Sequence, residues 1–248
     1  MIYKISLVLA VGLTLVYAFQ SFYPEFMSPF SNALFPFISG AVAISAIFAL
    51  RRYRSGSNEF SLVWFCFTAG MLLWFLGETG WAFYTFVLGT EIPYPSIADV
   101  FWLGGYIPLL IALYLYVKMF ASALSRRILG TVMAATLITA ILVTIALINP
   151  VVGTDEDLIT LITDFAYPLL DLVLFSMALL GLAVFQKGSL GKSWILITAG
   201  IILNTAGDFL FGYTTAQNTY YNGHPSELLF VWGYIVFTLA FYSHTKEL

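Results

Sequence analysis

The sequence predicts an all-α integral membrane protein with eight transmembrane helices. Three observations indicate this fold class: the apolar composition, the length of the apolar runs and the placement of the basic residues. Hydrophobic residues make up 60% of the 248-residue chain and charged residues only 9%, whereas a soluble globular chain has about 25% charged residues. The surplus apolar surface must face lipid, so we expect the chain to lie in a lipid bilayer. We expect a single helical domain over residues 1–248.

Apolar runs of about 20 residues are long enough to cross a bilayer as α-helices. We expect eight such spans, near residues 3–20, 32–50, 60–88, 96–119, 128–149, 158–185, 193–214 and 226–245. No polar stretch between them is long enough for a soluble domain.

The first four spans have distinct local features. The first begins with Lys4 and resembles a signal peptide, because Val16-Tyr17-Ala18 looks like a cleavage site; we expect a retained helix, since the chain keeps Met1. The third span carries Gly77-Glu78 deep within it. The fourth opens with Ser96-x-x-Asp99, a capping box that stabilises a helix start.

The last four spans repeat features of the first four. Tyr167-Pro168-Leu169 in the sixth span matches Phe35-Pro36-Phe37 in the second. Gly207-Asp208-x-x-Phe211-x-Tyr213 in the seventh matches Gly77-Glu78-x-x-Trp81-x-x-Tyr84 in the third.

The fourth and eighth spans match in the same way. The fourth opens Pro95-Ser96-Ile97-Ala98-Asp99 and reaches Tyr106, while the eighth opens Pro225-Ser226-Glu227 and reaches Tyr234 at the same spacing from its acid. The pattern suggests two parallel four-helix halves, residues 1–127 and 128–248, as occur in transporters. Chance, or the shared chemistry of helix starts, is the alternative.

The basic residues predict the orientation. If the chain has eight spans and a cytoplasmic N-terminus, all ten basic residues lie in cytoplasmic segments. They are Lys4, Arg51, Arg52, Arg54, Lys118, Arg126, Arg127, Lys187, Lys192 and Lys246. The outer loops hold Glu25, Glu91, Asp155, Glu156 and Asp157. By the positive-inside rule we expect a cell-membrane protein with both termini cytoplasmic.

Five acids fall within the outer half of the membrane: Glu78, Asp99, Asp164, Asp171 and Asp208. A carboxylate at the bilayer centre costs about 2.5–3.5 kcal/mol on the lenient scale, so such residues usually mark function. No basic residue is expected at this depth. Three compensations stay open: protonation, hydrogen bonds, or a bound metal ion or amine.

Each acid also has a structural interpretation. Asp99 suits a capping box, and Glu227 suits a helix N-terminus, where negative charge is favoured. Glu78, Asp171 and Asp208 lie far from helix starts, so capping does not explain them. The glycines of the third, fourth and seventh spans are expected to permit close helix packing.

We expect these acids to converge on a polar, aromatic-lined pocket that binds a small cationic or amphipathic ligand or a lipid. The predicted ligand-binding residues are Glu78, Trp81, Tyr84, Asp99, Tyr106, Asp164, Tyr167, Asp171, Asp208 and Tyr234. The candidates for a metal ion are Glu78, Asp171 and Asp208.

Several function classes are excluded or disfavoured. P-loop, GxSxG and HExxH motifs are absent from the sequence. His224, expected in an exposed loop, and His244 fall on opposite membrane sides, which disfavours a histidine-ligated haem or zinc. A net charge of −3 provides no basic face for nucleic acid, and Cys66 has no disulfide partner. The sequence does not identify a cofactor.

Some of these motifs resemble a known family. Gly77-Glu78-x-x-Trp81, Pro95-Ser96-x-x-Asp99 and Gly105-Tyr106, with Tyr167-Pro168-x-x-Asp171 and Gly207-Asp208, resemble the multi-helix membrane region ahead of prokaryotic diguanylate cyclase and histidine kinase domains. The resemblance covers roughly residues 70–240. It implies sensing of a signal that passes to a cytoplasmic domain. The chain stops at Leu248 without an output domain, so we expect a free-standing sensor with a signalling partner.

A weaker similarity is to membrane hydrolases of the lysoplasmalogenase type, which are eight-helix proteins with acids in Gly-Asp contexts. It implies a lysolipid hydrolase in which paired carboxylates activate water. Glu78 and Asp208 would then be the catalytic pair. The surrounding sequence matches that family poorly, so a sensor is the preferred prediction and an enzyme the alternative.

Overall fold

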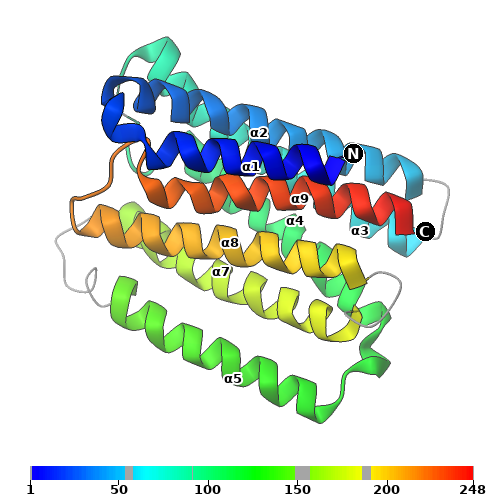
Figure 1. The fold of residues 1–248 in the computed structure, drawn as a ribbon. Coiled ribbons are helices and arrows are strands. Elements are labelled where there is room, and N and C mark those ends of the chain that lie inside the picture. Colours follow the sequence, from blue (N-terminus) through cyan, green and yellow to red (C-terminus); the bar gives the residue numbers. More distant parts are fainter. Residues whose placement is uncertain (1, 54–57, 91, 149–156, 186–190, 248) are drawn as a thin grey trace.

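The computed structural model of the protein describes residues 2–53, 58–90, 92–148, 157–185 and 191–247 (Figure 1). Its α-helices are α1 (Ile2–Ala18), α2 (Pro24–Tyr53), α3 (Asn58–Phe83), α4 (Ile97–Met119), α5 (Arg126–Val143), α7 (Leu158–Phe185), α8 (Gly191–Ala216) and α9 (Leu228–Glu247). Short 3₁₀ turns are η1 (Gln20–Phe22), η3 (Ala121–Ala123) and η5 (Pro225–Glu227), while η2 (Tyr84–Leu88) and η4 (Thr144–Ile148) are π-helical.

The protein is a multi-pass helical membrane protein. Within the described ranges, 7 helices are long and apolar enough to cross a membrane. Helix α1 is also apolar but has 17 residues, or about 26 Å at 1.5 Å per residue, against a hydrocarbon core of about 30 Å. The predicted helical membrane fold is confirmed, and whether α1 is an eighth span stays a prediction.

Helix α2 is longer than the sequence predicted. Its expected start near residue 32 is wrong, because the helix begins at Pro24. Proline suits the first helical position, and Glu25 in the first turn is favoured by the helix dipole. Glu25 therefore belongs to a helix and not to a loop. Pro29 and Pro36 lie inside this helix, which neighbouring helices make tolerable in membrane proteins.

Six helices form a closed ring around the core. Going round it, α2 packs against α3, α3 against α4, α4 against α7, α7 against α8, α8 against α9, and α9 against α2. Helices α1 and α5 lie outside the ring, with α1 against α9 and α5 against α7 (Figure 1). One hydrophobic cluster of buried side chains runs through the ring.

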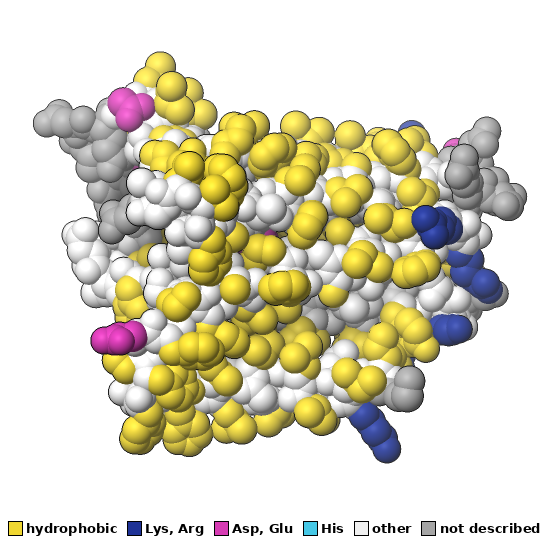
Figure 2. All heavy atoms as spheres, turned by 90° about the horizontal axis from the view of Figure 1, so that it is seen from above, with side chains coloured by type: hydrophobic (Ala, Val, Ile, Leu, Met, Phe, Trp, Pro, Cys, Tyr) yellow, Lys and Arg dark blue, Asp and Glu magenta, His cyan; other side chains and the backbone are white. Residues whose placement is uncertain are grey.

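Charge separates the two ends of the bundle. The start of α1 and the end of α9 lie at the same end in Figure 1. Figure 2 shows Lys and Arg gathered at that end, an apolar middle, and acidic side chains at the opposite end. We call these the basic end and the acidic end.

Five of the charges assigned to loops lie outside the described residues: Arg54, Glu91, Asp155, Glu156 and Lys187.

Glycines bring α3 and α4 into close contact. A Cβ added to Gly105 would lie 2.5 Å from Cδ1 of Trp74 and 3.2 Å from the backbone oxygen of Gly70. A Cβ added to Gly70 would lie 2.4 Å from Cγ of Leu109. Because only glycine leaves this room, the two backbones touch directly, and the residue after Gly105, Tyr106, is held at a fixed depth in the bundle.

Candidate functional site

One cluster of polar side chains inside the bundle joins α4, α7 and α8. Tyr106 places its hydroxyl oxygen 2.8 Å from Oδ1 of Asp171 and 3.3 Å from Oδ2 of Asp208. Thr205 also donates to Oδ1 of Asp171, at 3.2 Å. The second oxygen of Asp171 is buried without a hydrogen-bond partner in the structure. We call Tyr106, Asp171, Thr205 and Asp208 the paired-acid cluster.

Burial differs within this cluster. Asp171 is 1% exposed, Tyr106 2% and Thr205 4%, whereas Asp208 is partly exposed. An unpartnered oxygen on a buried carboxyl group is costly, because neither water nor a donor compensates for its lost hydration. The unpaired oxygen of Asp171 is thus the least satisfied polar atom of the cluster.

A second tyrosine–acid contact joins α9 and α3. Tyr234 donates its hydroxyl hydrogen to Oε1 of Glu78 at 2.7 Å. The two contacts cross between helix pairs: Tyr106 of α4 reaches Asp208 of α8, and Tyr234 of α9 reaches Glu78 of α3. Each tyrosine therefore contacts the acid that follows a glycine in the opposite half of the chain.

Asp99 has both a capping and a bridging contact. Its Oδ2 accepts hydrogen bonds from the backbone N–H of Ser96 at 2.7 Å and from the Ser96 hydroxyl at 3.0 Å, which completes the capping box of α4. Its Oδ1 accepts from Tyr167 at 2.9 Å. The ring of Tyr167 lies 6.4 Å from that of Tyr106, so Asp99 borders the paired-acid cluster without hydrogen-bonding to it.

Three predicted site residues are placed elsewhere. Asp164 accepts a hydrogen bond from Tyr94 at 2.5 Å. Trp81 donates from Nε1 to Oδ1 of Asn32 at 2.8 Å. Tyr84 begins the π-helical turn η2. In the part of the chain that the structure describes, no hydrogen bond joins Asp164, Trp81 or Tyr84 to the paired-acid cluster.

Glu227 is the acid whose surroundings the sequence missed. Its side chain is buried and accepts from four donors: the hydroxyls of Tyr17 and Tyr220 at 2.8 Å each, the hydroxyl of Ser31, and the backbone N–H of Gly223 at 2.8 Å. These contacts attach the α8–α9 connection to α1 and α2. The donors come from three separate places in the chain, namely α1, α2 and the α8–α9 connection, so local spacing could not have revealed the contacts with Tyr17 and Ser31.

Tyr220 lies in the connection between α8 and α9, at the acidic end. Burial and the neighbouring Glu227 carboxylate raise the pKa of this tyrosine above its usual value. Its hydroxyl therefore stays protonated and available as a donor to Glu227 at any ordinary pH.

The two histidines are both in hydrogen bonds. His224 accepts from the backbone N–H of Ser226 at 3.2 Å and caps η5, so it is partly buried where an exposed position was expected. His244, near the basic end, is 1% exposed and lies within hydrogen-bond distance of Tyr53 at 2.6 Å and Tyr116 at 3.1 Å.

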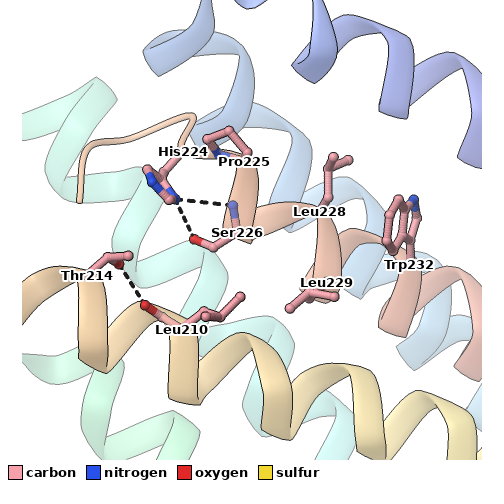
Figure 3. A pocket seen from close by; sticks show the side chains of 8 residues that line it. All are labelled: Leu210, Thr214, His224, Pro225, Ser226, Leu228, Leu229 and Trp232. Atoms are coloured by element: carbon pink, nitrogen blue, oxygen red, sulfur yellow. Dashed lines mark hydrogen bonds between the residues drawn. The ribbon is translucent and has the colours of Figure 1, made fainter. Parts of the chain in front are cut away.

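Two surface grooves lie on either side of Trp232. The larger, of about 390 Å³, lies between α8 and α9 at the acidic end and is shown in Figure 3. It is lined by Leu210, Thr214, His224, Pro225, Ser226, Leu228, Leu229 and Trp232. The other, of about 320 Å³, lies between α1 and α9. Neither is lined by a predicted site residue, so the grooves and the paired-acid cluster are separate features.

The described residues contain no group of three or more His, Cys, Asp or Glu side chains arranged to hold a metal ion. The paired-acid cluster instead offers two carboxyl groups and two hydroxyl groups. Comparisons of the chain with family models, with curated proteins and with solved structures give no match. The resemblances to sensor regions and to membrane hydrolases therefore stay predictions.

Proposed function

We propose that this protein is a membrane sensor that binds a small cationic ligand at the paired-acid cluster. The ligand is either a simple ion or the charged head of an amphipathic molecule. The observation that carries the proposal is that carboxyl groups from α7 and α8 contact one tyrosine hydroxyl from α4. Acidic groups inside a membrane bundle usually mark a ligand or ion pathway.

The charge balance supports a cation. Each described Lys and Arg lies in the first or last turn of its helix, whereas Asp171 and Asp208 lie well inside α7 and α8. The cost of burying the cluster's carboxyl groups is therefore offset by hydrogen bonds from the hydroxyls of Tyr106 and Thr205. Hydroxyl donors offset part of the cost of burying two carboxyl groups, and a cation would offset the rest.

The finer topology belongs to the same proposal. We take α1 as the eighth span and both termini as cytoplasmic, supported by the basic residues gathered at one end of the bundle (Figure 2). The paired-acid cluster then faces the outer half of the membrane. A signal would pass along the helices to a protein partner at the basic end.

A carboxyl pair also supports a second candidate, an intramembrane hydrolase. Two acids around one hydroxyl can perform acid–base chemistry when they hold different protonation states. The acids that share a hydroxyl are Asp171 and Asp208, and Glu78 contacts Tyr234 instead. The catalytic pair of this candidate is therefore Asp171 and Asp208, acting on a lysolipid.

Ligand-dependent thermal stability of the purified full chain tests the proposal. The ligands are alkali and alkaline-earth cations, primary and quaternary amines, and lysolipids. A ligand at 100 times its dissociation constant stabilises a protein by about 2.7 kcal/mol. We expect at least one cation to raise Tm in the wild type and to lose this effect in Asp208→Asn.

Asp164→Asn is the matched control, since it removes a carboxyl group from α7 outside the cluster and should keep the ligand effect. A Tm that none of these cations changes, or an equal shift in Asp208→Asn, contradicts binding of the tested metal ions and amines at the cluster. Cleavage of lysolipid that is lost in Asp208→Asn and kept in Asp164→Asn would replace the sensor by the hydrolase.

A further inference from the structure

Three oxygen atoms lie in a row at the centre of the paired-acid cluster. They are Oδ1 of Asp171, the hydroxyl oxygen of Tyr106 and Oδ2 of Asp208, with separations of 2.8 Å and 3.3 Å. A phenol carries one hydrogen and can donate it to one acceptor at a time. The row therefore has two oxygen–oxygen contacts but only one phenolic hydrogen to fill them.

The shorter contact takes that hydrogen. Tyr106 then donates to Asp171, and Oδ2 of Asp208 faces the lone pairs of the same hydroxyl oxygen. No other donor to Asp208 is found among the described residues. If Asp208 were ionised, two electron-rich oxygens would meet in a poorly hydrated interior with nothing between them, which is unfavourable. Protonation of Asp208 removes this repulsion, because the carboxyl O–H then donates to the hydroxyl oxygen of Tyr106.

We infer that the paired-acid cluster is a proton-binding site, and that the hydrogen ion is the cation this protein senses. The carboxylate of Asp208 takes up one proton from a hydronium ion: an O–H bond of hydronium breaks, the O–H bond of the carboxyl group forms, and water leaves. The carboxyl group then donates to the hydroxyl oxygen of Tyr106. Tyr106 still donates its phenolic hydrogen to Asp171. The inference rests on the proposed function, because it names the ligand of the same site.

Burial favours a proton over an organic cation. Asp171, Tyr106 and Thr205 are all at least nine-tenths buried, and neither groove beside Trp232 reaches them. An amine would need a cavity next to the unpaired oxygen of Asp171. A proton needs none, and Asp208 is the one acid of the cluster whose residue is not fully buried.

The other half of the chain supplies an internal comparison. Pro168 precedes Asp171 in α7 by the same spacing that separates Pro36 from Ser39 in α2. Ser39 donates to the backbone oxygen of Phe35 at 2.7 Å. Because position 39 is a serine, α2 supplies no second acid to the Tyr234–Glu78 contact. One phenolic hydrogen serves one acceptor acid there, and no additional proton is needed. The added acid at position 171 is what makes the paired-acid cluster different.

Other titratable groups face the cluster from the neighbouring helices. Tyr167 of α7 and Asp99 of α4 border it on one side. Glu78 of α3 and Tyr234 of α9 lie on the other side, where the charge of Glu78 acts on Asp208. Both acids already accept a tyrosine hydrogen, so their pairs are complete without a proton. Uptake at Asp208 would tie α8 to α4 through Tyr106, and release would loosen that link.

Infrared difference spectroscopy of the purified full chain in lipid, during a step from mildly acidic to mildly alkaline pH, tests the inference. We expect loss of the carbonyl band of a protonated carboxyl group in the wild type. The band should be absent in Asp208→Asn. It should also be absent in Asp171→Asn, because Tyr106 can then donate to Asp208. Tyr106→Phe should shift its frequency, since the accepting oxygen is gone.

Asp164→Asn is the control and should keep the band, because its carboxyl group contacts Tyr94 outside the cluster. A wild type without the band, or a band unchanged in both Asp208→Asn and Asp171→Asn, overturns the inference. Because Tyr106→Phe changes no charge, it keeps the test decisive if either Asn variant misfolds. A cation-dependent Tm shift without the band would refute the proton and leave cation binding in place. The band without any such shift supports the proton as the ligand.

Discussion

Gly105→Ala is expected to destabilise the protein, because α3 and α4 touch at this residue. The new Cβ would lie 2.5 Å from Cδ1 and 2.7 Å from Nε1 of Trp74, and 3.2 Å from the backbone oxygen of Gly70. Favourable carbon contacts need about 3.5–4.0 Å. The indole ring must therefore move by about 1 Å, or the two helices must separate.

Trp74 has little freedom to move. Its side chain is 5% exposed, its Nε1 donates to the backbone oxygen of Trp102 at 3.1 Å, and its ring contacts Tyr106 with centroids 5.6 Å apart. Overpacking costs about 1–3 kcal/mol, and losing the hydrogen bond adds about 1 kcal/mol. The better helix propensity of alanine returns up to about 1 kcal/mol. We expect a net loss of about 1–3 kcal/mol.

The assay is reversible unfolding in detergent, with Gly104→Ala as the matched control. A Cβ added to Gly104 meets nothing within 4 Å, so that variant should be neutral or slightly more stable. Equal stabilities of the two variants would refute the close-contact reasoning. Because Gly105 sets the depth of Tyr106, Gly105→Ala should also alter the infrared band of the paired-acid cluster, while Gly104→Ala should not.

Three further predictions concern the ends of helices. Ser96→Ala removes the capping hydroxyl of α4 and should cost about 0.5–2 kcal/mol of unfolding free energy in detergent; an unchanged value would contradict the cap. Gly89→Ala should cost about 1–2 kcal/mol in the same assay, because the residue has a φ of +62°, whereas Gly130→Ala, inside α5 with open space around it, should not destabilise. Hydrogen bonds from Thr160 lower the pKa of Asp157 in the folded protein. The ionised Asp157 therefore stabilises the fold above its unfolded-state pKa, and this stabilisation is lost as pH falls through its folded-state pKa. Amide exchange at the start of α7 should rise over that acidic range in the wild type and depend less on pH in Asp157→Asn.

The helices could be predicted because membrane segments follow a simple physical rule. A run of apolar residues must satisfy its backbone hydrogen bonds internally, so it becomes a helix. The expected span 158–185 coincides with α7 (Leu158–Phe185), and 96–119 nearly coincides with α4 (Ile97–Met119). The start of α2 was misjudged, because Pro24 and Pro29 resemble loop residues in the sequence yet lie in a helix.

The candidate site was harder to predict, because its contacts join distant segments. The spacing of Tyr106 and Tyr234 after their helix starts marked both as partners for acids. It did not show that each tyrosine contacts an acid in the opposite half of the chain. Asp164 and Asp171 are seven residues apart and therefore lie on one face of α7, yet only Asp171 contacts the paired-acid cluster.

The sequence by itself determined that this chain is a helical membrane protein, that its basic residues lie at the ends of its helices, and that several acids have no basic neighbour along the chain. Composition and run length are local properties, so they can be read without a structure. Only the tertiary structure decided which acids meet. The order of helices around the ring places α4 beside α7 and α7 beside α8, and the close glycine contact between α3 and α4 sets the depth of Tyr106. A hydrogen bond depends on differences of a few tenths of an ångström, which helix packing decides and sequence spacing does not.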